Sequence, residues 1–145
     1  MAQWWQQEPI RLIQTNLREI DARLDPRQIV RQVKAFHANA ILFSVGGIVS
    51  FYPTRLRFQT PVPYLYSECA LDRTPLYSSP VDHPSAVRDF VGEAVEEAHA
   101  LGLRFIARLD LSKSHKHVYE SRPEWFFRRP DGKPQVYNGL FSTCV

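Results

Sequence analysis

The stretch Leu103–Ser112, LRFIARLDLS, decides the fold that we expect. Successive side chains of a strand point to opposite faces. Here every odd-numbered residue is apolar, whereas the even-numbered ones are mostly polar. A strong helical pattern over Ser85–Leu101 leads straight into this strand, and that order is typical of α/β folds, whose parallel sheets are covered on both faces. The stretch therefore predicts that Arg108 and Asp110 are held inside the protein near a strand's C-terminal end, where α/β folds bind ligands.

The composition indicates one ordinary globular domain, with 145 residues of which 44% are hydrophobic and 23% charged. The net charge of +3 comes from scattered Lys and Arg residues, which argues against nucleic-acid binding. Cys69 and Cys144 form neither a metal-spaced pair nor a disulfide framework. Residues 1–25 lack the pattern of a signal peptide, and no apolar run approaches the ~20 residues of a membrane span. We therefore expect a cytoplasmic protein with no cofactor and with no nucleic-acid or membrane partner.

Two further strands are predicted before this one, after a lead-in over residues 1–10. Arg11–Leu17 and Ala40–Gly47 both alternate in the manner of strands. Gly46 and Gly47 end the second strand, where paired glycines allow either a sharp turn or a close approach of the backbone to a ligand. The faces expected to pack under helices are formed by Ile13, Thr15 and Leu17 in the first strand and by Ile41, Phe43 and Val45 in the second.

Two helices are predicted between the strands. The first begins at Asp25-Pro26-Arg27-Gln28, which combines a capping Asp, a Pro suited to the first turn and a capping-box Gln. Apolar residues then recur at helical spacing, and we expect Asn39 to end the helix in a left-handed conformation. The second helix, Ser85–Leu101, carries one continuous apolar stripe and stops at Gly102.

A long connection over residues 48–84 and a short C-terminal region complete the chain. The connection is rich in Pro and Tyr, and its tyrosines serve equally well to stack on a substrate or to pack the loop down. After the third strand, the sequence predicts a short helix that stops before Pro123, because the residue before a proline disfavours helical geometry. A hairpin over Trp125–Tyr137 is predicted around Pro130-Asp131-Gly132.

The three strands share one design, with one apolar face and one face that turns polar toward the C-terminal end. In a (β/α)8 barrel the inward face is packed low down and carries active-site groups at the top, over about 250 residues in all. We therefore predict an α/β fold that forms the N-terminal part of a TIM barrel. Three βα units and the start of a fourth would occupy residues 11–145, and an open three-stranded α/β sheet is the alternative. The polar face consists of Gln14 and Asn16, then Ser44 and Gly46, then Arg108, Asp110 and Ser112.

Several motifs, in the same order along the chain, resemble the barrels grouped as hypothetical glycosyl hydrolases, the sixth such group. The resemblance implies a TIM barrel that acts on glycosides, with carbohydrate as its partner. We accordingly expect the chain to be the N-terminal portion of a glycosidase, inactive alone and prone to self-association. The motifs are Gln14–Ala22, Val45–Val49 followed by Phe51–Thr54, Ala107–Lys113, Arg122–Trp125 and Asp131–Lys133.

Glycoside hydrolysis normally uses two carboxyl groups that flank the scissile bond. Asp110 is the one acid that we place on an inward strand end, and it is our catalytic candidate. Arg108 beside it lowers the pKa of this carboxyl, which favours holding sugar hydroxyls over donating a proton, and a purely structural pair is the alternative. Glu19 and Asp21 follow the first strand, and we expect them to face the same open end of the barrel. The candidates for binding substrate are Asn16, Asp21, Tyr52, Arg108, Ser112, Lys113, His115 and Trp125.

The segment His115-Lys116-His117 supports a second interpretation. Two histidines at i and i+2 of a strand point the same way and bind metals in amidohydrolase-like barrels. Here they follow the strand, in a segment expected to be helical or looped, where residues i and i+2 do not face each other. We therefore predict no metal site. A metal-dependent, amidohydrolase-like barrel is the second hypothesis, and a non-catalytic carbohydrate-binding or interaction module is the third.

Overall fold

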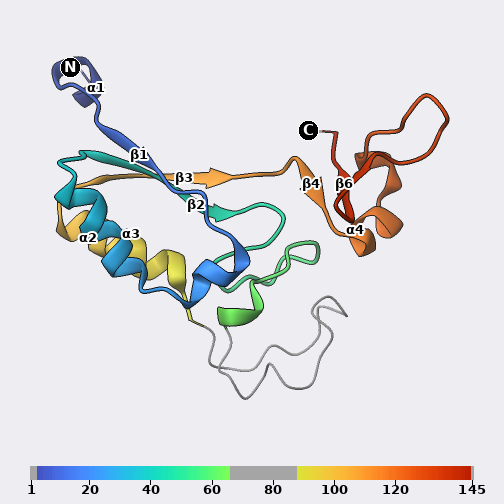
Figure 1. Ribbon diagram of the computed structural model, residues 1–145, viewed down its shortest axis with the longest axis horizontal. Helices are drawn as coiled ribbons and strands as arrows, with labels where there is room; N and C mark the ends of the chain where they lie inside the picture. Colours follow the sequence, from blue (N-terminus) through green and yellow to red (C-terminus); the bar gives the residue numbers. More distant parts are fainter. Residues whose placement is uncertain (1–2, 66–87, 145) are drawn as a thin grey trace.

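A computed structural model describes residues 3–65 and 88–144 (Figure 1). Its centre is a parallel sheet of three strands in the order β1-β2-β3. These are β1 (Leu12–Gln14), β2 (Ala40–Gly46) and β3 (Arg104–Leu109), each shorter than the strand predicted from the sequence. The mixture of helices with a parallel sheet confirms the α/β class.

The register of the sheet is continuous across all three strands. Ile13 pairs with Ile41, and Ile41 pairs in turn with Phe105, so these three side chains point to one face. The next row joins Gln14, Leu42 and Ile106 on the opposite face. The faces of β1 and β2 that were predicted to pack under helices are confirmed, since Ile41, Phe43 and Val45 are buried and Ile13 and Leu17 pack against this core.

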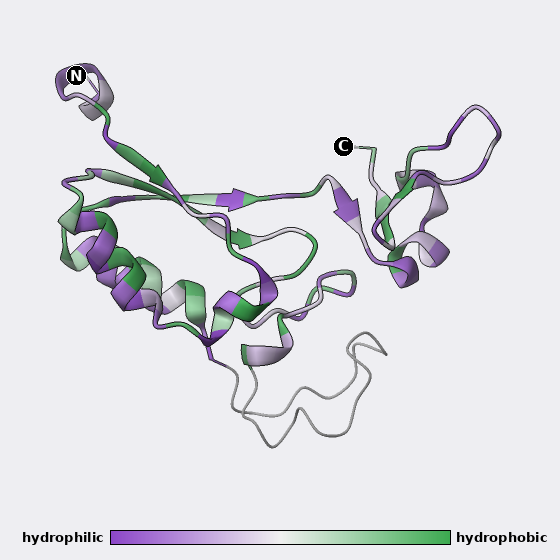
Figure 2. Ribbon diagram, in the orientation of Figure 1, coloured by the Kyte–Doolittle hydropathy of each residue, from purple (hydrophilic) through white to green (hydrophobic). Residues whose placement is uncertain are grey.

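Helices α2 (Pro26–Ala35) and α3 (Phe90–Ala100) lie side by side on one face of the sheet (Figure 1). Figure 2 shows hydrophilic and hydrophobic residues interspersed along both helices, and the buried ones recur at helical spacing, as in amphipathic helices. Phe90 is fully buried, with its ring 6.0 Å from that of Phe43, which in turn lies 5.3 Å from Phe105. On the outside, Arg27 and Glu96 form an ion pair of 2.7 Å between the two helices.

The ends of these helices differ in part from the prediction. Asp25 caps α2, because its Oδ1 accepts the Arg27 N–H at 2.9 Å. The helix ends at Ala35, and His37 rather than Asn39 takes the positive φ, of 58°. Asn39 instead forms hydrogen bonds to the lead-in: its side chain accepts the Arg11 N–H at 2.8 Å and donates to the Pro9 carbonyl.

The second helix begins later than Ser85. Residues 85–87 lie outside the described residues, Arg88 is not helical, and Asp89 caps α3 by accepting the Gly92 N–H at 2.8 Å. Gly102 follows the helix with φ of 65°, as predicted. Residues 66–84 of the predicted long connection, Cys69 among them, also lie outside the described residues. The described part of that connection includes η2 (Pro63–Leu65).

Two expectations about burial at β3 are wrong. Both α2 and α3 cover the same face, and β3 lies at the edge of the sheet. The side chains of Arg108 and Asp110 are therefore half-buried, at 31% and 45% exposed, rather than enclosed. Leu109 and Leu111 are also about half exposed, although their odd positions predicted burial. The burial alternation of β3 is lost from Ala107 onward, and Ala107 is itself exposed at an odd position. A β-bulge between Ser44 and Gly46 then shifts the pairing of β2 with β3 at this end.

The C-terminal region forms a second, antiparallel sheet in the order β4-β6-β5. It contains β4 (Lys113–Ser114), α4 (Lys116–Ser121), η4 (Pro123–Trp125), β5 (Val136–Tyr137) and β6 (Leu140–Ser142). The helix before Pro123 is confirmed, and the turn around Asp131 is closed by an isolated bridge between Arg128 and Pro134. A second hairpin, which the prediction missed, turns at Asn138 and Gly139, both with positive φ.

The lead-in contains one short helix, α1 (Trp4–Gln7), whose Trp4 ring lies 5.3 Å from the Arg104 guanidinium at the start of β3. Among the described residues, no helix is both long and apolar enough to cross a membrane.

Candidate functional site

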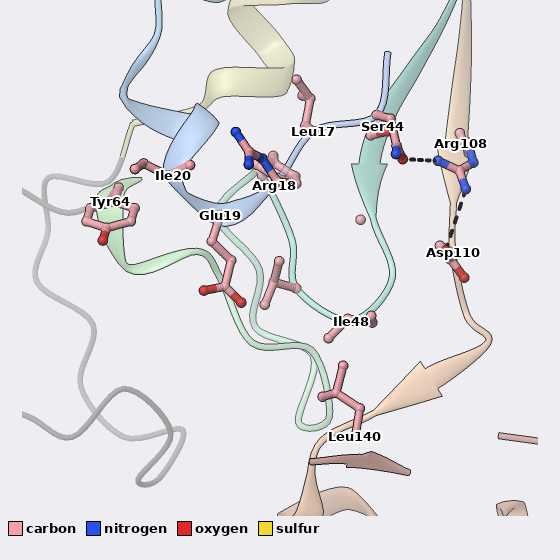
Figure 3. Close-up of a pocket in the computed structure, with 14 residues that line it drawn as sticks. Leu17, Arg18, Glu19, Ile20, Ser44, Ile48, Tyr64, Arg108, Asp110 and Leu140 are labelled. Carbon is pink, nitrogen blue, oxygen red and sulfur yellow. Dashed lines mark hydrogen bonds and ion pairs between the residues drawn. The ribbon is translucent and has the colours of Figure 1, made fainter. Parts of the chain in front are cut away.

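The carboxyl ends of the three parallel strands open into a cavity of about 460 Å³ (Figure 3). Its walls come from these strand ends, from the residues after β2, from the single turn η1 (Glu19–Arg23), from η2 and from β6. The carboxyl edge of a parallel sheet is where α/β folds bind ligands. The lining residues include Asn16, Glu19, Ser44, Gly46, Ile48, Tyr64, Arg108, Asp110 and Leu140.

Arg108 joins the two outer strands of the sheet across β2. It pairs with Ser44 in the register, and its Nη1 reaches over to donate to the Asn16 Oδ1 at 3.1 Å. Its Nη2 lies 3.5 Å from the Asp110 Oδ2. The sequence predicted that Asn16, Arg108 and Asp110 share one face, and the structure brings all three together.

Asp110 is held as an anion chiefly by Ser112. The Asp110 Oδ1 accepts the Ser112 hydroxyl at 2.7 Å and the Ser112 N–H at 3.1 Å. These two hydrogen bonds, and after them the charges of Arg108 and Lys113, hold the pKa of the Asp110 carboxyl below its ordinary value. The sequence pattern predicted the effect of Arg108 but not the larger effect of Ser112. An ionised carboxylate can accept hydrogen bonds or act as a nucleophile, but it has no proton to donate.

Of the two acids after β1, Glu19 lines the cavity and Asp21 does not. Asp21 is used by the backbone, since its Oδ2 accepts the Arg18 N–H at 2.7 Å at the start of η1. Asp21 thus makes the backward hydrogen bond of a capping box, but Arg18 is not a Ser or Thr cap, so the sequence carries no capping-box signature at this turn. Figure 3 shows the Glu19 carboxyl group on the other side of the cavity from Asp110. Among the described residues that line the cavity, Glu19 is therefore the second one with a carboxyl group, beside Asp110.

His115 directly follows β4 and is the N-cap residue of α4. It is half-buried, and burial, followed by the neighbouring His117, lowers the pKa of its imidazole. The two rings are stacked at 5.9 Å, so the expectation that they do not face each other is wrong. The backbone of His115 is extended at this N-cap position, so the helical spacing on which that expectation rested does not apply to it. In residues 3–65 and 88–144, no three His, Cys, Asp or Glu side chains gather to hold a metal ion.

Only two of the eight predicted binding residues, Asn16 and Arg108, line the cavity. The other six lie outside its lining: Asp21, Tyr52, Ser112, Lys113, His115 and Trp125. Lys113 places its Nζ 4.6 Å from the centre of the Tyr137 ring. Trp125 packs edge-to-face on Phe58 at 5.5 Å. Tyr52 accepts the Ser50 hydroxyl through its carbonyl. The structure adds lining residues that strand periodicity does not reveal, among them Tyr64 and Leu140, because they come from a loop and from a hairpin distant in the sequence.

Comparison with known proteins gives one match. The model of the family described as hypothetical glycosyl hydrolase 6 matches residues 25–145. Arg108 and Asp110 lie within the matched range, whereas Asn16 and Glu19 precede it. The chain matches no curated protein and no solved structure. The matched range spans most of the 145 residues, and the chain belongs to the hypothetical glycosyl hydrolase 6 family.

Proposed function

We propose that this chain is the N-terminal part of a (β/α)8 barrel glycoside hydrolase, with the cavity at the carboxyl ends of β1, β2 and β3 as part of its sugar-binding site. The family match supports hydrolysis of glycosides. The parallel sheet with helices on one face supports the barrel. The opposite face presents Leu12 and Ile106 at 45% and 44% exposed, and in a barrel this face is inward and packed.

The observation that carries the proposal is the chain of contacts from Asn16 through Arg108 to Asp110 and Ser112 on one wall of the cavity. Sugar hydroxyls both donate and accept hydrogen bonds. The Asp110 carboxylate would accept from them, and the Arg108 guanidinium would donate to them. Glu19 supplies a second carboxyl group on the same cavity. Two carboxyl groups are what glycoside hydrolysis requires.

The role of Asp110 is tested by Asp110→Asn in the full-length protein, which keeps the shape of the side chain and removes its charge. A residue that only holds hydroxyls contributes a charged hydrogen bond of ~1.5–3 kcal/mol, so we expect the activity on a glycoside to fall roughly ten- to a hundred-fold. A nucleophile would cause a far larger loss, because a whole catalytic step then lacks its reagent.

Asp131 offers a matched control outside the cavity. Its Oδ1 also accepts a backbone N–H two residues on, from Lys133 at 3.1 Å, and an arginine two residues before it, Arg129, lies 3.2 Å from its Oδ2. Asp131→Asn should therefore alter a similar turn and leave glycoside binding unchanged. Unchanged activity in Asp110→Asn, with only a lower melting temperature, would leave Asp110 as a structural partner of Arg108. Oligosaccharide binding without any turnover would favour a non-catalytic carbohydrate-binding module.

A further inference from the structure

Gly47, directly after β2, lies against the main chain of Asp110. A Cβ built on Gly47 would lie 2.6 Å from the Asp110 carbonyl carbon and 2.7 Å from the Asp110 nitrogen, and closer still to the carbonyl oxygen. All three are backbone atoms, which cannot swing aside as the end of a flexible side chain can. Gly47 also has φ of 134°, a conformation that residues with a Cβ rarely adopt. The close approach at Gly47 is therefore made to the main chain of Asp110, whereas the sequence predicted a sharp turn or an approach to a ligand.

Asp110 depends on this contact because β3 has already ended at Leu109. The Asp110 N–H donates to the Gly46 carbonyl at 3.0 Å, which continues the pairing beyond the bulge of β2. Gly47 is in turn held from the following loop, where the Gln59 Nε2 donates to its carbonyl at 3.2 Å. The backbone of Asp110 thus rests on Gly46 and Gly47, at the point where its side chain turns to Ser112 and the cavity.

We propose that Gly47 is a positioning residue for Asp110: its lack of a side chain lets the main chain of Asp110 approach β2, and this places the carboxylate against Ser112 at the cavity. The inference rests on the proposed function, since the position matters for activity only if Asp110 contacts the substrate. If the glycine were required only for its turn, an added Cβ would strain the backbone at residue 47 but leave the Asp110 carboxylate in place. The two roles therefore predict different results at Asp110 itself.

The test is Gly47→Ala in the full-length protein, with Gly132→Ala as the matched control. Gly132 also has a positive φ, of 79°, but a Cβ there meets nothing within 4 Å, so this control carries the backbone strain without the contact. The pH titration of the Asp110 carboxyl carbon, assigned with Asp110→Asn, is followed by NMR. We expect Gly47→Ala to move the midpoint up toward the ordinary value of about 3.9, because the bonds to Ser112 are weakened, and Gly132→Ala to leave it unchanged.

Gln59→Ala gives a second variant in case Gly47→Ala does not fold. It removes the hydrogen bond to the Gly47 carbonyl from a loop side chain, and it should raise the Asp110 midpoint in the same direction. An unchanged midpoint in the folded variants overturns the positioning role. Glycoside affinity, measured in the same proteins, distinguishes a failure of the inference about Gly47 from a failure of the proposed function. Affinity that responds to Asp110→Asn but not to Gly47→Ala overturns the inference, whereas affinity that ignores Asp110→Asn overturns the proposed function.

Discussion

At the residue scale, the charge of the site is set by short hydrogen bonds more than by ion pairs. Ser112 contributes two bonds to one oxygen of Asp110, at 2.7 and 3.1 Å, whereas the Arg108 guanidinium stands 3.5 Å from the other oxygen. Both Asp110 and Arg108 are partly open to water, which screens their mutual attraction. The carboxylate therefore stays ionised through neutral pH, and Arg108 keeps donors for a ligand.

His115 gives a pH-dependent prediction at the same scale. Burial, and then His117, lower the pKa of its imidazole, so below about pH 6.5 the unfolded chain binds this proton more readily than the folded one. The stability that depends on neutral His115 is present above that pH, and it is lost as the pH falls from about 6.5 toward the lowered pKa. We expect melting temperatures, followed by circular dichroism, to fall between pH 7 and 5.

The matched variants for this prediction are His115→Gln and His99→Gln. His115→Gln removes the titrating group and should flatten the pH dependence of the melting temperature. His99 is exposed near the end of α3, so His99→Gln should keep the slope of the wild type. If the melting temperature of His115→Gln falls with pH as steeply as that of the wild type, another titrating group causes the dependence.

Sequence patterns predicted those site residues whose position depends on strand periodicity. Asn16, Arg108 and Asp110 share the polar face of the sheet, and all three line the cavity. Between Glu19 and Asp21 the prediction left the choice open, because the geometry of η1 decides which carboxylate caps the turn. Tyr64 could not be predicted from any period, since it reaches the cavity from a loop and the single turn η2.

At the element scale, neighbouring residues in the sequence determine where a helix begins, whereas contacts with distant residues determine where a strand ends. Asp25 caps α2 as its sequence predicts. The end of β3 departs from its sequence pattern because a bulge in the neighbouring strand and the open edge of the sheet, neither of which is local to LRFIARLDLS, determine the burial of Leu109. The hairpin at Asn138-Gly139 did carry a local signal, since this dipeptide favours the tight turn of a two-residue hairpin.

The cap of α2 yields a stability prediction. Asp25→Ala removes the acceptor for the Arg27 N–H and should lower the free energy of unfolding by about 1 kcal/mol, as the loss of an N-cap typically does. Asp25→Ser is the matched control, because serine accepts the same bond. Urea denaturation compares the two variants. Equal stability of the alanine and serine variants would show that the cap contributes nothing measurable.

At the scale of the whole molecule, the described residues cover one face of the sheet with helices and leave the other face without them. The helices cover the face that holds Phe43, while the opposite face and the edge at β3 present Leu12, Ile106 and Leu109 to solvent. An open edge of this kind pairs readily with other chains. We therefore expect the 145-residue chain to self-associate, and sedimentation velocity should show species larger than the monomer at micromolar concentration.

Charge on the exposed face tests whether that surface is responsible. The double variant Ile106→Lys and Leu109→Lys should shift the distribution toward monomer. Phe36→Lys changes a more exposed apolar residue, at 76%, beyond the end of α2, and it should leave the distribution unchanged. A wild-type chain that sediments as a single monomer with a sharp melting transition would contradict this expectation.

The parallel pairing of the strands also sets an order of assembly. Joining β1 to β2 brings residue 12 to residue 40, whereas joining β2 to β3 brings residue 40 to residue 104, a closure more than twice as long. Closure entropy rises by about 0.6 kcal/mol for each doubling of the loop. The unit of β1, α2 and β2 is thus the easier one to close, and it is also synthesised first. Arg108 and Asp110 arrive with β3, so the charged wall of the cavity is completed last, and until then the edge of β2 is open to neighbouring nascent chains.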